Sequence, residues 1–284
     1  MPSRKHRSSE FHGLSLALIL LLAPASVLAA PGSALFTSSF LAFGTGTTPR
    51  LVAAGDLNGD GLTDVVVGNQ GSNSVSVMPG QGDGTFGTRT DIPLGMSPGA
   101  IALADLDGDT RLDLVLANTA ADSVVVLLSG DIGCPGCWDY KVRPSETAAL
   151  HPAISYQTGA APAGIAIADL NADGYADLVT ANRSAGTVSV LFGVGDGTFQ
   201  VHNDFFVGPS PSAVAIADVN GDTKPDLVVT NSGNSTVSVL IGNGVGGFAA
   251  HVDYPCGITP RAVLVADLNH DGKADVVTAN ANYF

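Results

Sequence analysis

Basic residues are scarce in this chain. Its 284 residues include 12 Lys+Arg against 26 Asp+Glu, which gives a formal net charge of −14 at pH 7. A protein that binds nucleic acid needs a stripe of Lys and Arg to contact the phosphates. The sequence contains no such stripe, so we do not expect nucleic acid as a partner.

Glutamate and the motifs of nucleophilic catalysis are also lacking. Beyond residue 29 the only Glu is Glu146, so a glycosidase with paired carboxylates would have to use Asp residues that other features occupy. No motif gives a Ser or Cys partner to the later His residues, and no G-x-S-x-G elbow occurs. We therefore assign no catalytic residue and do not expect an enzyme.

Long hydrophobic runs are absent except near the N-terminus. Basic residues at positions 4–7 precede the apolar run Leu14–Ala23, and small residues lead up to Ala29. This layout is typical of a secretory signal peptide, although a retained signal anchor would share it. The run is too short to span a bilayer comfortably. We expect residues 1–29 to be a signal peptide and residues 30–284 to form the mature, secreted or surface chain, without a membrane span.

What the chain has in abundance is a nine-residue acidic loop, present five times. Side chains with an oxygen recur at loop positions 1, 3, 5 and 9. They are Asp56, Asn58, Asp60 and Asp64; Asp105, Asp107, Asp109 and Asp113; Asp169, Asn171, Asp173 and Asp177; Asp218, Asn220, Asp222 and Asp226; and Asp267, Asn269, Asp271 and Asp275. Calcium binds about six to eight oxygens, which carboxylates on a tight turn supply. Ordinary turns do not need three neighbouring carboxylates, which repel one another. We predict about five calcium sites.

An EF-hand is the alternative for such loops, but it ends in a bidentate Glu at position 12 between two helices. Position 12 here is Val67, Leu116, Thr180, Val229 or Thr278. Each loop also follows a small apolar run and precedes a β-branched one, as Ala213–Ala217 and Leu227–Thr230 illustrate. The sequence therefore predicts a metal loop that joins two strands.

The acidity of the chain has the same origin. Removal of residues 1–29 leaves nine basic and 25 acidic residues, a net charge of −16, and sixteen of these acids lie in the five loops. Bound divalent cations would neutralise much of this charge. The acidity thus indicates calcium and does not require a cationic partner.

The loops begin at residues 56, 105, 169, 218 and 267, a spacing of 49 residues with one exception of 64. Within the fourth repeat we predict strands A to D at Ala213–Ala217, Leu227–Thr230, Val237–Ile241 and about Ala249–Tyr254. A four-stranded antiparallel meander cannot bury both faces alone, and radial stacking of such sheets gives a β-propeller. A parallel β-helix also binds calcium through repeats, but its period is only about six to nine residues.

These repeats resemble the FG-GAP/VCBS repeats of bacterial secreted proteins and of the integrin α propeller. Besides the loops, the resemblance rests on Val239–Gly244, Gly195–Phe199 and Gly82–Phe86, and it covers about residues 35–284. It implies an all-β propeller of four-stranded antiparallel blades with calcium loops in the A–B hairpins. It also implies that the position 7 carbonyl is a ligand, here that of Leu62, Arg111, Tyr175, Lys224 and Lys273.

Two loops depart from the family pattern, because Thr110 and Thr223 stand where Gly is usual. If this position needs φ > 0, Thr is strained there, and we expect loops two and four to be weaker sites.

The fifth repeat stops at Phe284, before its strands C and D. We therefore expect about four and a half blades, an incomplete propeller, and a chain that is the N-terminal fragment of a longer protein. Leu35–Phe43 resembles a strand D whose own blade is missing.

Repeat two is longer than the others between strands C and D. Residues 131–151 hold the only Trp of the chain, Trp138, with several basic residues. Such a loop is a candidate binding surface, or an unremarkable surface insertion.

Within this loop, Cys134 and Cys137 have a spacing that suits a local disulfide in an oxidising compartment, with a zinc half-site as the alternative. Cys256 stands where repeat one has Leu94, so we expect it to be a small buried side chain.

The sequence thus predicts a secreted or surface calcium-stabilised β-propeller that acts as a binding or adhesion module for an extracellular protein or a glycan. The alternative is an extracellular carbohydrate-active enzyme that resembles a polysaccharide lyase, or a propeller attached to a separate catalytic domain. A lyase needs a Lys, Arg or Tyr base, and Tyr140, Lys141 and Arg143 form the one cluster.

Four Asn residues of the B–C turns would line the face opposite the metal, or simply end the strands. They are Asn69, Asn118, Asn182 and Asn231.

Overall fold

A computed structural model of the chain describes residues 41–129, 137–138 and 153–281. The predicted signal peptide, Cys134 and the Tyr140–Arg143 cluster lie outside these residues, so the disulfide and the role of the 131–151 loop stay predictions. No helix within the described ranges is long and apolar enough to cross a membrane.

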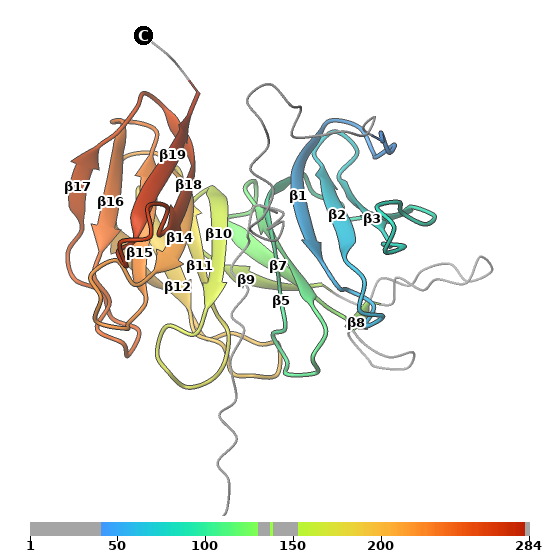
Figure 1. Cartoon of the computed structure of the whole chain (residues 1–284), viewed down its shortest axis with the longest axis horizontal. Helices are drawn as coiled ribbons and strands as arrows, with labels where there is room; N and C mark the ends of the chain where they lie inside the picture. The colour runs from blue at the N-terminus through green and yellow to red at the C-terminus, as the bar shows by residue number, and fades with distance from the viewer. Residues whose placement is uncertain (1–40, 130–136, 139–152, 282–284) are drawn as a thin grey trace, which may run out of the picture.

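The regular secondary structure of the described residues consists of β-strands alone. The strands form four mainly antiparallel sheets and one hairpin (Figure 1). The first sheet is β1 Pro49–Gly55, β2 Asp64–Asn69, β3 Ser74–Met78 and β4 Thr90–Pro93. The second is β5 Pro98–Ala104, β6 Asp113–Asn118, β7 Ser123–Ser129 and β9 Ile154–Gln157, with the short β8 Cys137–Trp138 parallel to β7. The third is β10 Pro162–Ala168, β11 Asp177–Asn182, β12 Thr187–Leu191 and β13 Asn203–Phe206. The fourth is β14 Pro211–Ala217, β15 Asp226–Asn231, β16 Thr236–Leu240 and β17 Val252–Pro255. The hairpin is β18 Pro260–Ala266 and β19 Asp275–Asn280.

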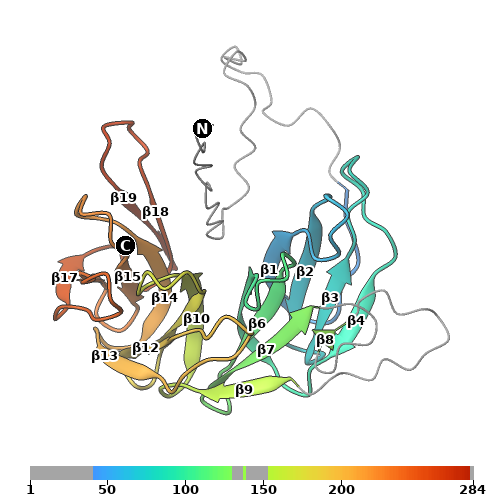
Figure 2. The ribbon, with the colours of Figure 1, turned by 90° about the horizontal axis from the view of Figure 1, so that it is seen from below.

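The sheets stand side by side as blades in an open arc, with the first sheet at one end and the hairpin at the other (Figure 2). The first strands of successive sheets are neighbours, which places strands A on the inside of the arc and strands D on the outside. The sheets do not close into a ring. The predicted all-β architecture of an incomplete propeller with four and a half blades is confirmed.

Proline begins every inner strand, at Pro49, Pro98, Pro162, Pro211 and Pro260, and the register shifts directly after it. Proline is tolerated at the first residue of a strand because it has no N–H to give to the ladder. The predicted strands of the fourth repeat are confirmed except that strand D begins at Val252. Ala249 lies before it because Phe248 first forms a bridge with Gly242.

The core lies between the sheets, since the second strand of each of the four sheets is buried on both faces. In β6, Leu114 and Leu116 pack into the cluster between the first and second sheets, whereas Val115 packs into the cluster between the second and third. All three side chains have an exposed fraction of 0%. Alternation along one strand thus connects successive blades, and a third cluster joins the third sheet to the fourth.

The Asn residues at the ends of β2, β11 and β15 are fully buried and hydrogen-bonded to a Ser of the third strand, whereas Asn118 at the end of β6 is half-buried. Asn182 is fully buried, and its Nδ2 donates to Oγ of Ser189 at 2.8 Å. Ser189 donates in turn to Asp204 at 2.6 Å, and His202 contacts the same carboxylate oxygen at 2.9 Å. The carboxylate lies between Ser and His, so this network clamps three strands together and lacks the Ser–His contact of a catalytic triad. Of the two roles predicted for these Asn residues, the structure supports strand termination.

Two further expectations need correction. Cys256 is half-buried, because it lies in the linker before β18 and not in a sheet, and its thiol contacts the carbonyl of Gly257 at 3.5 Å. The described part of the predicted strand at Leu35–Phe43 is not a strand. Phe43 still packs its ring against Phe86, with centroids 5.0 Å apart and an interplanar angle of 85°.

Candidate metal centre

The five acidic loops connect the first and second strands of the four sheets and of the hairpin. Within each loop, backbone amides point at the carboxylates. In loop one, Asp56 accepts the N–H of Gly59 on Oδ1 at 2.7 Å and the N–H of Gly61 on Oδ2 at 2.8 Å. The bond from position 6 to the position 1 carboxylate recurs in the other four loops at 2.7 to 2.9 Å. These bonds hold the carboxylates in place and leave each oxygen a further lone pair for a cation.

Loop two brings three carboxylates together. Oxygens of Asp105, Asp107 and Asp109 all lie within 4.8 Å of one another. Burial raises the pKa of Asp107, and the neighbouring Asp109 and Asp105 raise it further. A divalent cation would remove this repulsion, so the donor set of loop two fits a hard ion.

In the other loops position 3 is Asn, whose amide oxygen is also a hard ligand. Asn58 accepts the N–H of Asp60 on Oδ1 at 2.7 Å and donates from Nδ2 to Oδ2 of Asp60 at 2.8 Å. Asn171 makes both contacts with Asp173 at 2.9 and 2.8 Å. In these two loops position 3 therefore lies beside the position 5 carboxylate.

In the four complete sheets the position 9 Asp is buried and already has two backbone partners. Asp177 has no exposed surface, and it accepts the N–H of Leu170 from its own loop and of Gly193 from the end of the third strand, both at 2.8 Å. Burial raises its pKa to about 6, against the lowering effect of these two amides. The pKa of Asp113 is raised to about 7 for the same reason. A buried carboxylate that resists ionisation gains most from a nearby cation, which favours the charged form.

The position 7 side chains of loops three and four extend along a neighbouring loop of the same sheet, and Nζ of Lys224 also lies 3.8 Å from Oδ2 of Asp222 in its own acidic loop. A Cβ added at Gly195 would collide with the Tyr175 ring, and one added at Gly244 would lie 3.1 Å from the Lys224 chain. These side chains therefore cover the loop between the third and fourth strands. The predicted carbonyl ligand at position 7 stays a prediction.

Positions 4 and 6 of every loop have positive φ. Position 6 is Thr110 at 73° and Thr223 at 68°, so the condition for strain in loops two and four is met. Sequence reasoning missed the same condition at position 4, where Ala172 has φ 61° and His270 has φ 61°. Only loop one has Gly at both places. Every other loop thus carries one strained residue, and Thr, which is β-branched, is the most strained.

Position 2 is a second feature that the sequence analysis did not identify. Leu170 is 1% exposed, and its carbonyl accepts the N–H of Gly246 in the next sheet at 3.2 Å. Leu106 accepts the N–H of Gly197 in the same way at 3.0 Å. The apolar residue at position 2 of an otherwise acidic loop was the sequence signal that could have predicted this buried contact. Acidic loops two and three are therefore part of the contact between blades.

Residues 56–116, 169–229 and 218–278 match the family model described as FG-GAP-like repeat. These segments amount to more than half of the chain, and each runs from one acidic loop through the next. The chain belongs to the FG-GAP-like repeat family. The resemblance stated from the sequence is thereby confirmed, and FG-GAP repeats are often calcium-binding.

Solved structures with this fold include BBS1N in complex with ARL6DN, at 16% identity and a TM-score of 0.51, covering 78% of this chain and 57% of that one. A lectin from Agrocybe aegerita matches at 22% identity and a TM-score of 0.51, covering 81% of this chain and 60% of that one. The FG-GAP chain thus spans less than two thirds of the length of either structure. At these identities the likeness concerns the fold. No curated protein sequence matches the chain.

Proposed function

We propose that the chain is a secreted or surface-displayed module whose FG-GAP blades bind calcium and which binds an extracellular protein or a glycan. The observation that carries the calcium part is the convergence of Asp105, Asp107 and Asp109 within 4.8 Å. In each loop, the side chains of positions 1, 3, 5 and 9 and the carbonyl of position 7 would hold the ion. Calcium would supply charge neutralisation and rigidity there.

Calcium would act on the contact between blades as well as on each loop. The position 2 residue donates its N–H to the buried position 9 Asp and gives its carbonyl to the next sheet, as Leu170 does. A loop fixed by an ion would therefore fix both contacts. Extracellular modules bind calcium with Kd of about 10⁻⁴ to 10⁻³ M, so each site would contribute on the order of 1 kcal/mol at millimolar calcium.

The binding role is supported by the family and the fold. FG-GAP repeats are binding modules typical of extracellular proteins. The Agrocybe aegerita lectin has this fold, and its structure concerns recognition of non-reducing terminal N-acetylglucosamine. An arc of blades can therefore support glycan recognition, although the residues that do so differ from protein to protein.

A binding screen tests the proposal. The calcium-loaded full chain should bind a subset of glycans or extracellular proteins on an array, and a variant without residues 131–151 should lose this binding while keeping its melting temperature. The control deletes the Gly82–Phe86 loop of the first sheet, whose loss should leave binding intact. Unchanged binding after removal of 131–151 would move the binding surface elsewhere, and the absence of any binding would contradict the role.

A further inference from the structure

Three Asn-Gly pairs occur in the chain, and two of them stand at positions 3 and 4 of an acidic loop. They are Asn58–Gly59 in loop one and Asn220–Gly221 in loop four, whereas the third, Asn243–Gly244, lies between β16 and β17. The side-chain amide of Asn is open to attack by the backbone nitrogen of the next residue, and Gly permits the closest approach because it has no Cβ. The surroundings of each pair decide whether this attack is assisted.

In both acidic loops the nitrogen that would attack already shares its hydrogen with a carboxylate. Gly59 donates its N–H to Oδ1 of Asp56 at 2.7 Å, and Gly221 donates its N–H to Oδ1 of Asp218 at 2.7 Å. A carboxylate acts as a general base over about 2.6 to 3.2 Å. The position 1 carboxylate can therefore take the proton as the nitrogen attacks.

The side-chain amide that would be attacked is held by a hydrogen-bond donor. Oδ1 of Asn58 accepts the N–H of Asp60 at 2.7 Å, and Oδ1 of Asn220 accepts the N–H of Asp222 at 2.8 Å. A donor aimed at a carbonyl oxygen stabilises the negative charge that develops there when a nucleophile adds to the carbon. Each of the two loops thus supplies both a base and an oxyanion donor.

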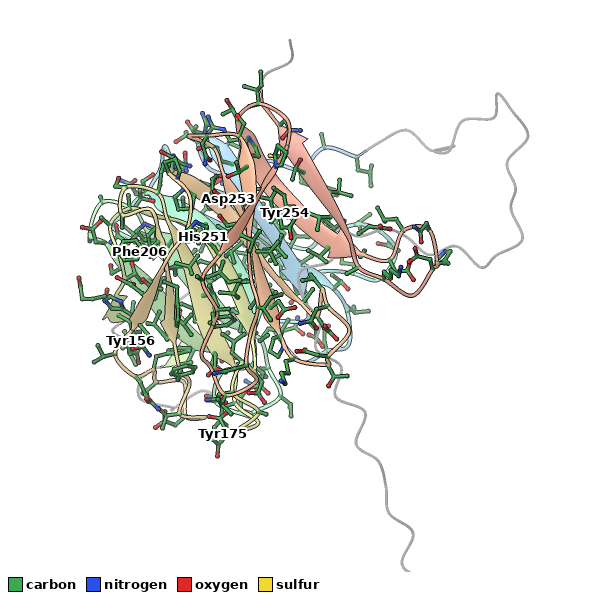
Figure 3. The ribbon with its side chains drawn as sticks, turned by 90° about the vertical axis from the view of Figure 1, so that its left-hand side faces the viewer. Tyr156, Tyr175, Phe206, His251, Asp253 and Tyr254 are labelled. Atoms are coloured by element: carbon green, nitrogen blue, oxygen red, sulfur yellow. The ribbon has the colours of Figure 1, made fainter. Side chains whose placement is uncertain are left out.

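The reaction does not require a sheet to open. Gly59 and Gly221 are exposed, have φ of 73° and 80°, and lie outside the strands. A Cβ added at either residue would meet nothing within 4 Å, so the backbone there has room to turn. The acidic loops lie at one end of the blades, which Tyr175 of loop three marks in Figure 3. Ring closure can therefore take place in the folded chain.

Two other Asn residues each lack one part of this arrangement. Asn171 of loop three has the oxyanion donor, the N–H of Asp173 at 2.9 Å, but the next residue is Ala172. In the described structure the Ala172 N–H makes no hydrogen bond to the position 1 carboxylate. Asn243 accepts the N–H of Val245 at 2.9 Å and is followed by Gly, but no described carboxylate accepts the N–H of that Gly. The chain thus contains its own controls.

We propose that Asn58 and Asn220 are sites of self-catalysed deamidation in the metal-free chain. In loop one, the nitrogen of Gly59 bonds to Cγ of Asn58 while the Asp56 carboxylate takes its proton. The bond from Cγ to Nδ2 then breaks, and the amide group leaves with that proton as ammonia. Water opens the resulting cyclic imide at one of its two carbonyls, which gives an aspartyl or an isoaspartyl residue. Water is the only co-reactant.

The two products change the loop in different ways. An aspartyl residue at position 3 gives loop one the three carboxylates that loop two has in Asp105, Asp107 and Asp109. An isoaspartyl residue carries the main chain through the former side chain and lengthens it by one carbon atom, which displaces the N–H of Asp60. This chemistry takes place without metal, so it is independent of calcium binding by the loops.

The test incubates the full chain in chelator at mildly alkaline pH and follows each Asn by mass spectrometry of proteolytic peptides. Each deamidation adds about one mass unit, and enzymatic methylation detects the isoaspartyl product. We expect Asn58 and Asn220 to convert first, Asn243 more slowly and Asn171 slowest. In urea the three Asn-Gly pairs should convert at similar rates, because the folded loops supply the carboxylates. Conversion of Asn243 as fast as Asn58 in the folded chain would overturn the proposal.

Two opposite substitutions separate this chemistry from a loss of stability. Gly59→Ala places a Cβ at positive φ, which destabilises the fold, yet it should slow conversion of Asn58 by about tenfold. Ala172→Gly relieves such strain, yet it should speed conversion of Asn171 by about tenfold. If general loosening of the chain controlled the reaction, both rates would change in the opposite direction.

A third substitution tests the base. Asp56→Asn keeps an oxygen that accepts the N–H of Gly59 but removes the negative charge. It should slow conversion of Asn58 and leave the rate at Asn220 as it is in the unaltered chain. An unchanged or faster rate at Asn58 in Asp56→Asn or in Gly59→Ala, or an unchanged rate at Asn171 in Ala172→Gly, would overturn the proposal.

Discussion

The N–H of Leu170 donates to Oδ2 of Asp177 over 2.8 Å, which ties the second residue of an acidic loop to its ninth. Asp177 also accepts the N–H of Gly193, and the Leu170 carbonyl accepts the N–H of Gly246 in the next sheet. One carboxylate and one leucine thus connect the loop to its own third strand and to the neighbouring blade. Stability and metal binding should therefore be separable within one loop.

Replacement of Asp177 tests this separation. Asp177→Ala leaves two buried N–H groups unpaired and should lower the free energy of unfolding by about 2–5 kcal/mol, even in chelator. Asp173→Ala, at the exposed position 5, should change stability in chelator by less than about 1 kcal/mol and act mainly when calcium is present. Urea denaturation of both variants, with and without calcium, measures the difference. Equal losses in chelator would show that the two carboxylates have the same role.

Relief of backbone strain should strengthen loops two and four. Thr110 and Thr223 have φ 73° and 68°, and Gly adopts such values without a Cβ penalty. Thr110→Gly or Thr223→Gly should raise stability by about 1 kcal/mol, and Ala172→Gly should give less. The reverse change, Gly61→Ala, should be destabilising through φ alone, since a Cβ there meets nothing within 4 Å. Thermal melts decide this, and a loss of stability in both Thr→Gly variants would contradict the strain.

Metal-free protein should be less stable above neutral pH than at about pH 5. The pKa of Asp113 is raised to about 7 by burial, and burial also raises the pKa of Asp64, Asp107 and Asp177. The folded chain therefore binds more protons than the unfolded chain between about pH 4 and pH 7, and stability falls as pH rises through this window. The urea midpoint in chelator should follow this trend, and Asp113→Asn should flatten it. A midpoint that rises with pH in chelator would contradict the assignment.

The sequence was sufficient to predict the strands of the blades but not the burial and hydrogen bonds of the carboxylates in the acidic loops. The spacing of 49 residues and the β-branched runs located the strands, because burial on both faces leaves a plain apolar signature in residues such as Leu227 and Val228. The carboxylates at positions 1, 5 and 9 looked equivalent in the sequence. In the four complete sheets the structure separates a buried carboxylate at position 9 from half-buried or exposed ones at positions 1 and 5, because position 9 is the first residue of the second strand.

Other features depend on contacts that no local pattern contains. Positive φ at Ala172 and His270 follows from the path of the turn. Because only three of the five loops have Gly at position 4, the sequence did not show that this position needs positive φ. The start of the fourth strand depends on the bridge between Gly242 and Phe248, which pairs residues across a loop.

Calcium titration of the metal-stripped full chain, followed by calorimetry and by a thermal melt, is the most direct measurement. We expect saturable binding at up to about five sites with Kd of about 10⁻⁴ to 10⁻³ M, and a melting temperature that falls strongly when chelator is added. Asp60→Ala and Asp173→Ala should each remove about one site and the corresponding part of the melting shift. The absence of calcium binding, or a melting temperature that is the same with calcium and with chelator, would contradict a calcium-stabilised propeller.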